Sequence, residues 1–230
     1  MTPLLLLPGM MCDGRLFGPQ IDAFGADREV TVGDLGGADT VAEMAHQVLE
    51  KAAPRFALVG LSLGGIVAME VIRQAPHRVE RLALLDTNPR AELATVQAAR
   101  EVQIAGVEQG QLRTILRDEM KPLYLAQGPR RQQILDQCMA MALTLGEGVF
   151  VRQSRALQSR PDQQASLARV AVPSLVLMGE QDQLCPLDRH QLMHQLLPQS
   201  RLVIIAEAGH LPTLEQPAAT NAALKQWLES

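Results

Sequence analysis

The chain has 230 residues, a hydrophobic fraction of 47% and a formal net charge of −4, which suits one compact domain with a large core. The acidic balance and an aromatic content of 3% argue against nucleic acid or an anionic membrane as the main partner. Those ligands favour basic faces and, for single strands, aromatic stacking platforms.

Cysteine usage and the opening segment bear on where the protein works. Cys12, Cys138 and Cys185 are an odd number at spacings that match neither a disulfide framework nor a zinc site, which favours a reducing compartment. The opening MTPLLLLPGM lacks the positive region of a secretion signal. No segment approaches the ~20 apolar residues that span a bilayer. We therefore expect a cytoplasmic protein with no membrane partner and no metal.

Six short apolar runs bounded by turn residues are predicted strands. Because they lack polar alternation, they are typical of strands covered on both faces in a parallel sheet. In chain order they are Leu4–Leu7, Val30–Val32, Phe56–Val59, Leu82–Leu85, Ser174–Met178 and Leu202–Ile205. Segments of helical periodicity, such as 40–53, separate most of them. This alternation predicts an α/β fold, with a mostly parallel central sheet of about six strands flanked by helices.

One interval breaks this alternation. From about Asn88 to Arg160 the chain has helical pattern and no convincing strand, and so long an interval cannot be a tight crossover between two strands. We expect residues 88–160 to form an inserted helical lobe over the carboxyl ends of the strands. Residues 1–87 and 161–230 would then form the core.

The stretch FALVGLSLGGIVAMEVI, residues 56–72, places one serine among glycines where a strand should turn into a helix. Its GLSLG segment matches the G-x-S-x-G of a nucleophile elbow, whose strained turn lifts a serine hydroxyl clear of the sheet. Gly60 and Gly64 fit this reading, because larger side chains would collide in the turn. Any small-residue turn could carry a serine, but the strand–turn–helix context favours Ser62 as a nucleophile.

A serine nucleophile needs a base that removes its proton, and the chain has five histidines. His210 lies in AGHLPTLEQP, directly after the last predicted strand and at the same sheet edge as the elbow. The alternative is a loop histidine that caps backbone groups. The remaining histidines fall in or at the ends of predicted helices, and they are His46, His77, His190 and His194. We interpret His210 as the base.

The base needs an acid that orients it. Asp182 follows the buried run SLVLMG at the same edge of the sheet, on a loop that could reach His210. A plain turn aspartate is the alternative reading. Asp86, at the end of the preceding strand in LALLDTNP, is the rival acid. Glu180 and Glu207 suit exposed turn positions.

Two backbone N–H groups are candidates for stabilising a charged tetrahedral intermediate. One belongs to Leu63, after the serine, and the other to Met10, in the loop LLLLPGMMCDG that follows the first strand. One such donor is worth roughly 10²–10³ in rate. Met10 could equally be a packing residue.

Candidate substrate contacts are weaker. An apolar acyl pocket could involve Met11, Tyr124, Met139 and Phe150, although core packing explains these residues equally well. Arg152, Arg155 and Arg160 could meet a substrate carboxylate, but a solvated helix face is the favoured interpretation.

Taken together, the chain resembles the α/β-hydrolase family over essentially its whole length. The blocks that carry the resemblance are LLLLPG, VGLSLGG, VPSLVLMGEQDQLCP and AGHLPTLEQP, in the family's order of nucleophile, acid and histidine. Two departures stand out: Pro8-Gly9 replaces a common His-Gly, and the family's first antiparallel hairpin is missing. The family's helical cap corresponds to residues 88–160.

The resemblance implies a cofactor-independent serine hydrolase of the small, cap-bearing esterase or lactonase branch. It would cleave a small carboxylic ester through an acyl-enzyme, with Ser62, His210 and Asp182 as the catalytic triad. A lactonase, an acyl thioesterase or a hydrolase of carbon–carbon bonds could use the same residues. A non-catalytic ligand-binding homologue is a further alternative from a different class.

Overall fold

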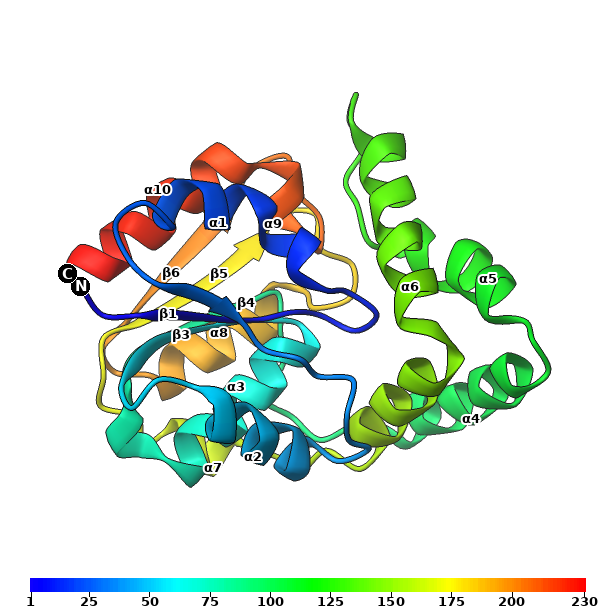
Figure 1. Ribbon diagram of the computed structural model, residues 1–230, viewed down its shortest axis with the longest axis horizontal. Helices are drawn as coiled ribbons and strands as arrows, with labels where there is room; N and C mark the ends of the chain where they lie inside the picture. The colour runs from blue at the N-terminus through cyan, green and yellow to red at the C-terminus, as the bar shows by residue number, and fades with distance from the viewer.

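The computed structural model describes residues 1–230. At its centre lies a six-stranded, wholly parallel sheet with the order β2-β1-β3-β4-β5-β6 (Figure 1). The strands are β1 (Leu4–Leu7), β2 (Val30–Val32), β3 (Phe56–Leu61), β4 (Val79–Leu85), β5 (Ser174–Gly179) and β6 (Ser200–Ile205). All six predicted strands are confirmed, and so is the predicted fold class.

The sheet is buried on both faces because its strands alternate apolar side chains between two core clusters. In β1, Leu5 and Leu7 join one cluster, whereas Leu4 and Leu6 join the other, and all four are at most 4% exposed. The expected burial fails at the outermost strands, β2 and β6, which are partly exposed. Each of these strands has a neighbour on one side only.

Helices cover the sheet in two layers (Figure 1). On one face lie α1 (Gly18–Phe24), α9 (Pro212–Glu215) and α10 (Pro217–Glu229), and on the other α2 (Val41–Lys51), α3 (Leu63–Gln74), α7 (Gln164–Leu167) and α8 (Leu187–Leu196). Helix α2 begins where the Thr40 side chain accepts a hydrogen bond from the Glu43 N–H at 3.2 Å, a favourable N-cap. Short 3-10 turns span Gly14–Phe17, Pro76–Arg78 and Lys121–Leu123.

Residues 88–160 contain no strand. They form α4 (Ala94–Glu108), α5 (Leu112–Ile115), a π turn at Leu116–Met120 and α6 (Arg131–Gln158). Figure 1 shows α4, α5 and α6 grouped together beyond the carboxyl ends of the strands. We call residues 88–160 the insertion.

Helix α6 corrects one expectation from the sequence. By length and composition alone it could cross a membrane, whereas no stretch of the sequence is expected to do so. Its backbone, however, leaves the helical region at Gly146, with φ 79° and ψ 178°, so two shorter helices meet there. Buried residues from both halves, including Cys138 and Phe150, join the two core clusters.

Candidate active site

Ser62 stands between β3 and α3 in a strained backbone conformation, with φ 55° and ψ −116°. Few residues other than glycine adopt a positive φ, and such residues concentrate at functional sites. Two hydrogen bonds hold the turn: the Ser62 N–H donates to the Leu85 carbonyl at 2.9 Å, and the Thr87 hydroxyl donates to the Ser62 carbonyl at 2.7 Å. The end of strand β4 and the residues just after it therefore hold Ser62 in its strained conformation.

The glycines around Ser62 allow backbone segments to approach closely. A Cβ atom at Gly60 would lie 2.3 Å from the Gly64 carbonyl oxygen, and one at Gly64 would lie 2.0 Å from the Leu7 carbonyl oxygen. Neither position can accept a side chain without moving the backbone. The need for small residues that the sequence indicates thus has a direct steric cause.

His210 and Asp182 form a buried pair. His210 Nδ1 lies 2.9 Å from Asp182 Oδ2, and both residues are less than 10% exposed. Asp182 Oδ1 accepts the backbone N–H groups of Leu184 and Cys185 at 2.8 and 3.1 Å. Burial alone would raise the pKa of Asp182, but the imidazole and these N–H groups outweigh burial and hold that pKa below its usual value.

An ionised Asp182 can only accept a hydrogen bond, so the contact fits the His210 tautomer that carries its proton on Nδ1; in the neutral form of that tautomer Nε2 is an acceptor. Ser62 and His210 both line a cavity of about 410 Å³. No hydrogen bond joins Ser62 Oγ to His210. The strained serine and the oriented imidazole therefore line the same cavity without a hydrogen bond between them.

The rival acid, Asp86, has different partners. It ends β4, is fully buried, and its Oδ1 accepts the Gly179 N–H at 2.8 Å. Burial, reinforced by the nearby Asp182 carboxylate, raises the pKa of Asp86 well above its usual value. The imidazole of His210 is bonded to Asp182 rather than to Asp86. Glu180 and Glu207 are exposed.

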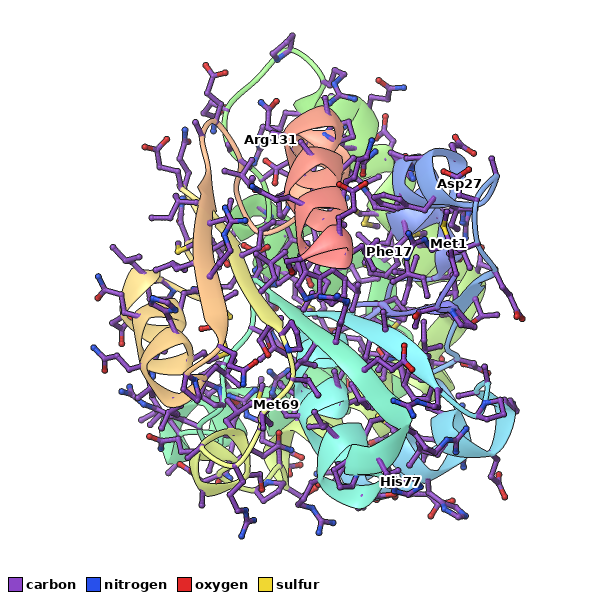
Figure 2. The ribbon with its side chains drawn as sticks, turned by 90° about the vertical axis from the view of Figure 1, so that its left-hand side faces the viewer. Met1, Phe17, Asp27, Met69, His77 and Arg131 are labelled. Atoms are coloured by element: carbon purple, nitrogen blue, oxygen red, sulfur yellow. The ribbon has the colours of Figure 1, made fainter.

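The other four histidines do not line the cavity. His46, His77 and His194 are exposed, and Figure 2 shows His77 at the periphery of the molecule. His190 is buried, with Nδ1 3.3 Å from the Pro186 carbonyl oxygen. Burial lowers the pKa of His190 to about 4, so it is neutral at pH 7.

The loop after β1 lies against the elbow. A Cβ atom at Gly9 would lie 3.4 Å from Ser62 Cβ. The next residue, Met10, has a backbone N–H with no hydrogen-bond partner. The N–H of Leu63, in the first turn of α3, has no partner within the helix. Both predicted donors therefore belong to segments that adjoin Ser62.

Gln153, a residue that sequence reasoning missed, fixes this loop from the insertion. Its side-chain oxygen accepts the Met11 N–H at 2.8 Å, and its Nε2 donates to the Leu35 carbonyl at 3.2 Å. Met11 has a φ of 55°. No sequence signal distinguishes this glutamine from the others in α6.

Glu215, also missed, fixes the histidine loop. Its buried carboxylate accepts backbone N–H groups of Gly209 and Leu211 at 3.0 Å and of Ala126 at 2.8 Å. The His210 N–H donates to the Tyr124 carbonyl at 2.7 Å. A signal existed here, because Glu215 belongs to the AGHLPTLEQP block that also contains His210.

The structure corrects most of the predicted pocket. Tyr124 lines the cavity, and its ring centroid lies 5.7 Å from that of His210. The cavity reaches neither Met11 nor Phe150, which are fully buried in the core, nor Met139, which packs against the same cluster. The apolar part of the wall consists instead of Met10, Ile66, Ala91, Leu93, Val96, Ala99, Met120, Leu123, Tyr124, Leu157, Leu184 and Cys185.

One group of side chains approaches a metal-binding arrangement. Ligand-type atoms of Asp182, Cys185 and His210 lie within 4.8 Å of one another. Asp182 and His210 are already bonded to each other. Burial and the Asp182 charge raise the pKa of the Cys185 thiol well above its usual value, so it carries a proton and is a poor metal ligand.

Fold and site geometry define an α/β enzyme scaffold with a serine turn at the carboxyl edge of its sheet. The chain matches the profile of the alpha/beta hydrolase family over residues 4–223, and it belongs to this family. This confirms both the resemblance drawn from the sequence and the assignment as a hydrolase.

The chain is similar to one curated protein and two solved structures within this comparison. The pimeloyl-[acyl-carrier protein] methyl ester esterase of Klebsiella pneumoniae is 29% identical over 194 residues, which cover 80% of this chain and 73% of that enzyme. A thermophilic esterase from Thermogutta terrifontis, solved with malate bound, is 26% identical with a TM-score of 0.91, covering 100% of this chain and 90% of the other. The enol-lactonase of Burkholderia xenovorans has a TM-score of 0.87 at 18% identity, over 100% of this chain and 92% of its own. That last likeness concerns the fold alone.

Proposed function

We propose that this protein is a serine hydrolase that cleaves a small carboxylic ester, with Ser62 as nucleophile, His210 as base and Asp182 as orienting acid. The observation that carries the proposal is the buried His210–Asp182 hydrogen bond beside the cavity that Ser62 also lines. Two of the three relatives described above are named esterases, which supports an ester as the bond attacked.

In the first half-reaction, His210 Nε2 takes the proton from Ser62 Oγ as the oxygen attacks the ester carbonyl carbon. The carbonyl oxygen becomes an oxyanion, which the N–H groups of Met10 and Leu63 stabilise. Asp182 stabilises the resulting imidazolium. Collapse of the intermediate breaks the bond to the alcohol, which leaves with the proton from His210, and the acyl group remains on Ser62.

In the second half-reaction, a water molecule gives a proton to His210 Nε2 and attacks the acyl carbonyl carbon. The second tetrahedral intermediate uses the same two N–H groups. Its collapse returns the proton to Ser62 Oγ and releases the carboxylic acid. Every proton is thus accounted for without a cofactor.

The insertion acts as a cap in this scheme. Met120, Tyr124 and Leu157 come from it and contribute apolar surface to the cavity, which fits a small acyl substrate. We place the enzyme in the cytoplasm, which the three free cysteines support.

The test is the Ser62→Ala variant. We expect hydrolysis of p-nitrophenyl acetate to fall to the uncatalysed rate, while the melting temperature changes little. Ser159→Ala, at an exposed serine in the insertion, is the matched control and should keep full activity. A fluorophosphonate probe should label the wild type and not Ser62→Ala. Full activity of Ser62→Ala, or a wild type that resists the probe, would contradict the proposal and favour a non-catalytic binder.

A further inference from the structure

The cavity beside Ser62 has a positively charged wall. Its ionisable side chains, apart from His210, Tyr124 and Cys185, are Arg90, Arg100, Arg160, Arg189, Glu92 and Glu119. Arginines therefore outnumber the lining carboxylates by two, although Asp188, which does not line the cavity, lies 3.7 Å from Arg90 and 3.6 Å from Arg189 and offsets one of these charges. This excess is unexpected in a chain whose net charge is −4.

Two of these arginines share one carboxylate. Arg100 Nε lies 2.7 Å from Glu92 Oε2, and Arg160 Nη2 lies 2.9 Å from Glu92 Oε1. The side chains of Arg100, Arg160 and Glu92 are 16%, 9% and 5% exposed. Neither arginine has a second carboxylate partner within ion-pair distance. One positive charge therefore remains uncompensated in a largely dehydrated place, where charge is costly.

Arg160 also has unused hydrogen-bonding capacity. A guanidinium group carries five N–H donors, and the only polar side-chain contact of Arg160 is the ion pair with Glu92. Its Nε atom is buried without any hydrogen-bond partner. An unsatisfied buried donor costs about 1–3 kcal/mol, so a ligand that accepts this N–H would bind favourably.

The remaining arginines near the insertion differ from this pair. Arg155 forms an ion pair with Glu101, in which both side chains are about half exposed, and Arg152 Nε donates to the Gly36 carbonyl at 2.7 Å. Neither lines the cavity. Arg160 alone among the three arginines of that segment is turned into the cavity wall, contrary to the solvated face that the sequence favours.

The arginine pair also lies close to the reactive centre. Arg100 Nη1 is 3.7 Å from Met10 Sδ, and the backbone N–H of Met10 is one of the two proposed oxyanion donors. One methionine side chain therefore separates the guanidinium of Arg100 from the place where the ester carbonyl would lie. A single small molecule can reach both.

We propose that Arg100 and Arg160 form an anion subsite, and that the substrate is an ester carrying a second, ionised carboxylate. The inference rests on the proposed ester hydrolysis and narrows its substrate class. A planar carboxylate matches the donor geometry of guanidinium groups. Glu92 holds the two arginines in place and competes with the substrate for them.

Matched substrates test this subsite. Monomethyl adipate and methyl hexanoate share a six-carbon acyl chain and differ by one carboxylate, whereas 4-acetoxybenzoate and phenyl acetate place the difference on the leaving group. We expect kcat/KM, measured by proton release, to favour the charged member of at least one pair. Equal or lower values for the charged member of both pairs would overturn the proposal.

The variants are compared by one ratio, kcat/KM for the charged substrate divided by kcat/KM for its neutral partner. Arg160→Gln should lower it roughly 10-fold to 100-fold, the value of a hydrogen bond to a charged group. Arg155→Gln, at the half-exposed arginine near the end of α6, should leave that ratio unchanged. Glu92→Gln should raise it, because a competitor for the arginines is removed, whereas a purely structural clamp would give no rise. An unchanged ratio in Arg160→Gln, or a fall in Glu92→Gln, would refute the subsite.

Two further measurements distinguish a variant that does not fold, and a protein that does not hydrolyse esters, from a failure of the subsite itself. If Arg160→Gln loses its circular dichroism spectrum, Arg100→Gln is measured in its place, with the same expected fall. If the wild type hydrolyses neither these four esters nor p-nitrophenyl acetate, the proposed function fails, and calorimetry with adipate then decides the subsite by itself. Adipate should bind the wild type more tightly than the arginine variant, and equal affinities would refute the anion subsite.

Discussion

The core and the insertion contribute different things to the same cavity. The core supplies Ser62 and His210 to the cavity, and it also supplies Asp182, which is hydrogen-bonded to His210. The insertion supplies much of the apolar wall and both guanidinium groups of the proposed anion subsite. Its helix α4 buries only Ile104 and Val107. In the proposed reaction, the chemistry therefore depends on the sheet edge, and the choice of substrate depends on the insertion.

Several polar contacts join these two regions near the site. From the insertion, Gln153 binds the Met11 N–H, the Ala126 N–H binds Glu215, and the Tyr124 carbonyl accepts the His210 N–H. These contacts make the comparison testable, because changes in the core and in the insertion should have separable effects.

The largest effect should come from the acid in the core. Asp182→Asn removes the charge that orients and stabilises the His210 imidazolium, so we expect kcat to fall roughly 10³–10⁴-fold. Asp86→Asn keeps an acceptor for the Gly179 N–H and should retain most activity. Steady-state hydrolysis of p-nitrophenyl acetate by both variants distinguishes the two acids, and a large loss in Asp86→Asn would contradict the assignment.

Asp86→Asn should also change how the free energy of unfolding depends on pH. The folded-state pKa of Asp86 is raised, so above about pH 4 the unfolded chain releases a proton that the folded protein retains. The free energy of unfolding therefore decreases as the pH rises towards the folded-state pKa. Asn cannot ionise, so the variant should lose less stability than the wild type between about pH 5 and pH 8. Thermal unfolding at both pH values measures this, and equal slopes would contradict it.

The next comparison is between the stability costs of one Gly→Ala substitution in the core and one in the insertion. Gly64→Ala in the core would place Cβ 2.0 Å from the Leu7 carbonyl oxygen, so we expect a loss of about 3 kcal/mol or more in the free energy of unfolding. Gly128→Ala in the insertion meets no atom within 4 Å and should stay within about 0.5 kcal/mol of the wild type. Urea denaturation checks both values, and similar losses would break the comparison.

The smallest effect should come from the contact between the regions. Gln153→Leu leaves the Met11 N–H and the Leu35 carbonyl unsatisfied, at about 1–3 kcal/mol in stability. Because the adjoining Met10 N–H would then be displaced, kcat should fall roughly 10-fold to 100-fold with little change in KM. Gln132→Leu, at an exposed glutamine of the same helix, is the control. A change confined to KM would indicate that Gln153 affects substrate binding instead.

The sequence alone is sufficient to predict the strands of the sheet and the edge at which the loops of the candidate site lie. Buried parallel strands are short and wholly apolar, so runs such as Leu4–Leu7 are recognisable without tertiary information. The carboxyl ends of parallel strands meet at one edge of the sheet, so the sequence predicts that Asp182 and His210 lie near each other. Their hydrogen bond of 2.9 Å agrees with that placement.

The side chains of the insertion could not be predicted in the same way. The apolar pattern allows Met139 and Phe150 to line a pocket or to pack in a core, and in the structure Phe150 is buried in the core and Met139 packs against it. Gln153 and Arg160 depend on contacts with residues far away in the chain, and no local spacing encodes those contacts. Helical periodicity indicates which face is buried, but not whether a buried polar group meets a loop or a cavity.

The polar contacts of Glu215 and Tyr124 have a consequence for engineering this enzyme. The loop of His210 is anchored on one side by its own chain and on the other by main-chain atoms at 124–126. Exchanging residues 88–160 for a foreign segment would thus remove half of the support for the base. A successful graft would have to present a carbonyl and an N–H at those two places, whatever side chains it introduced.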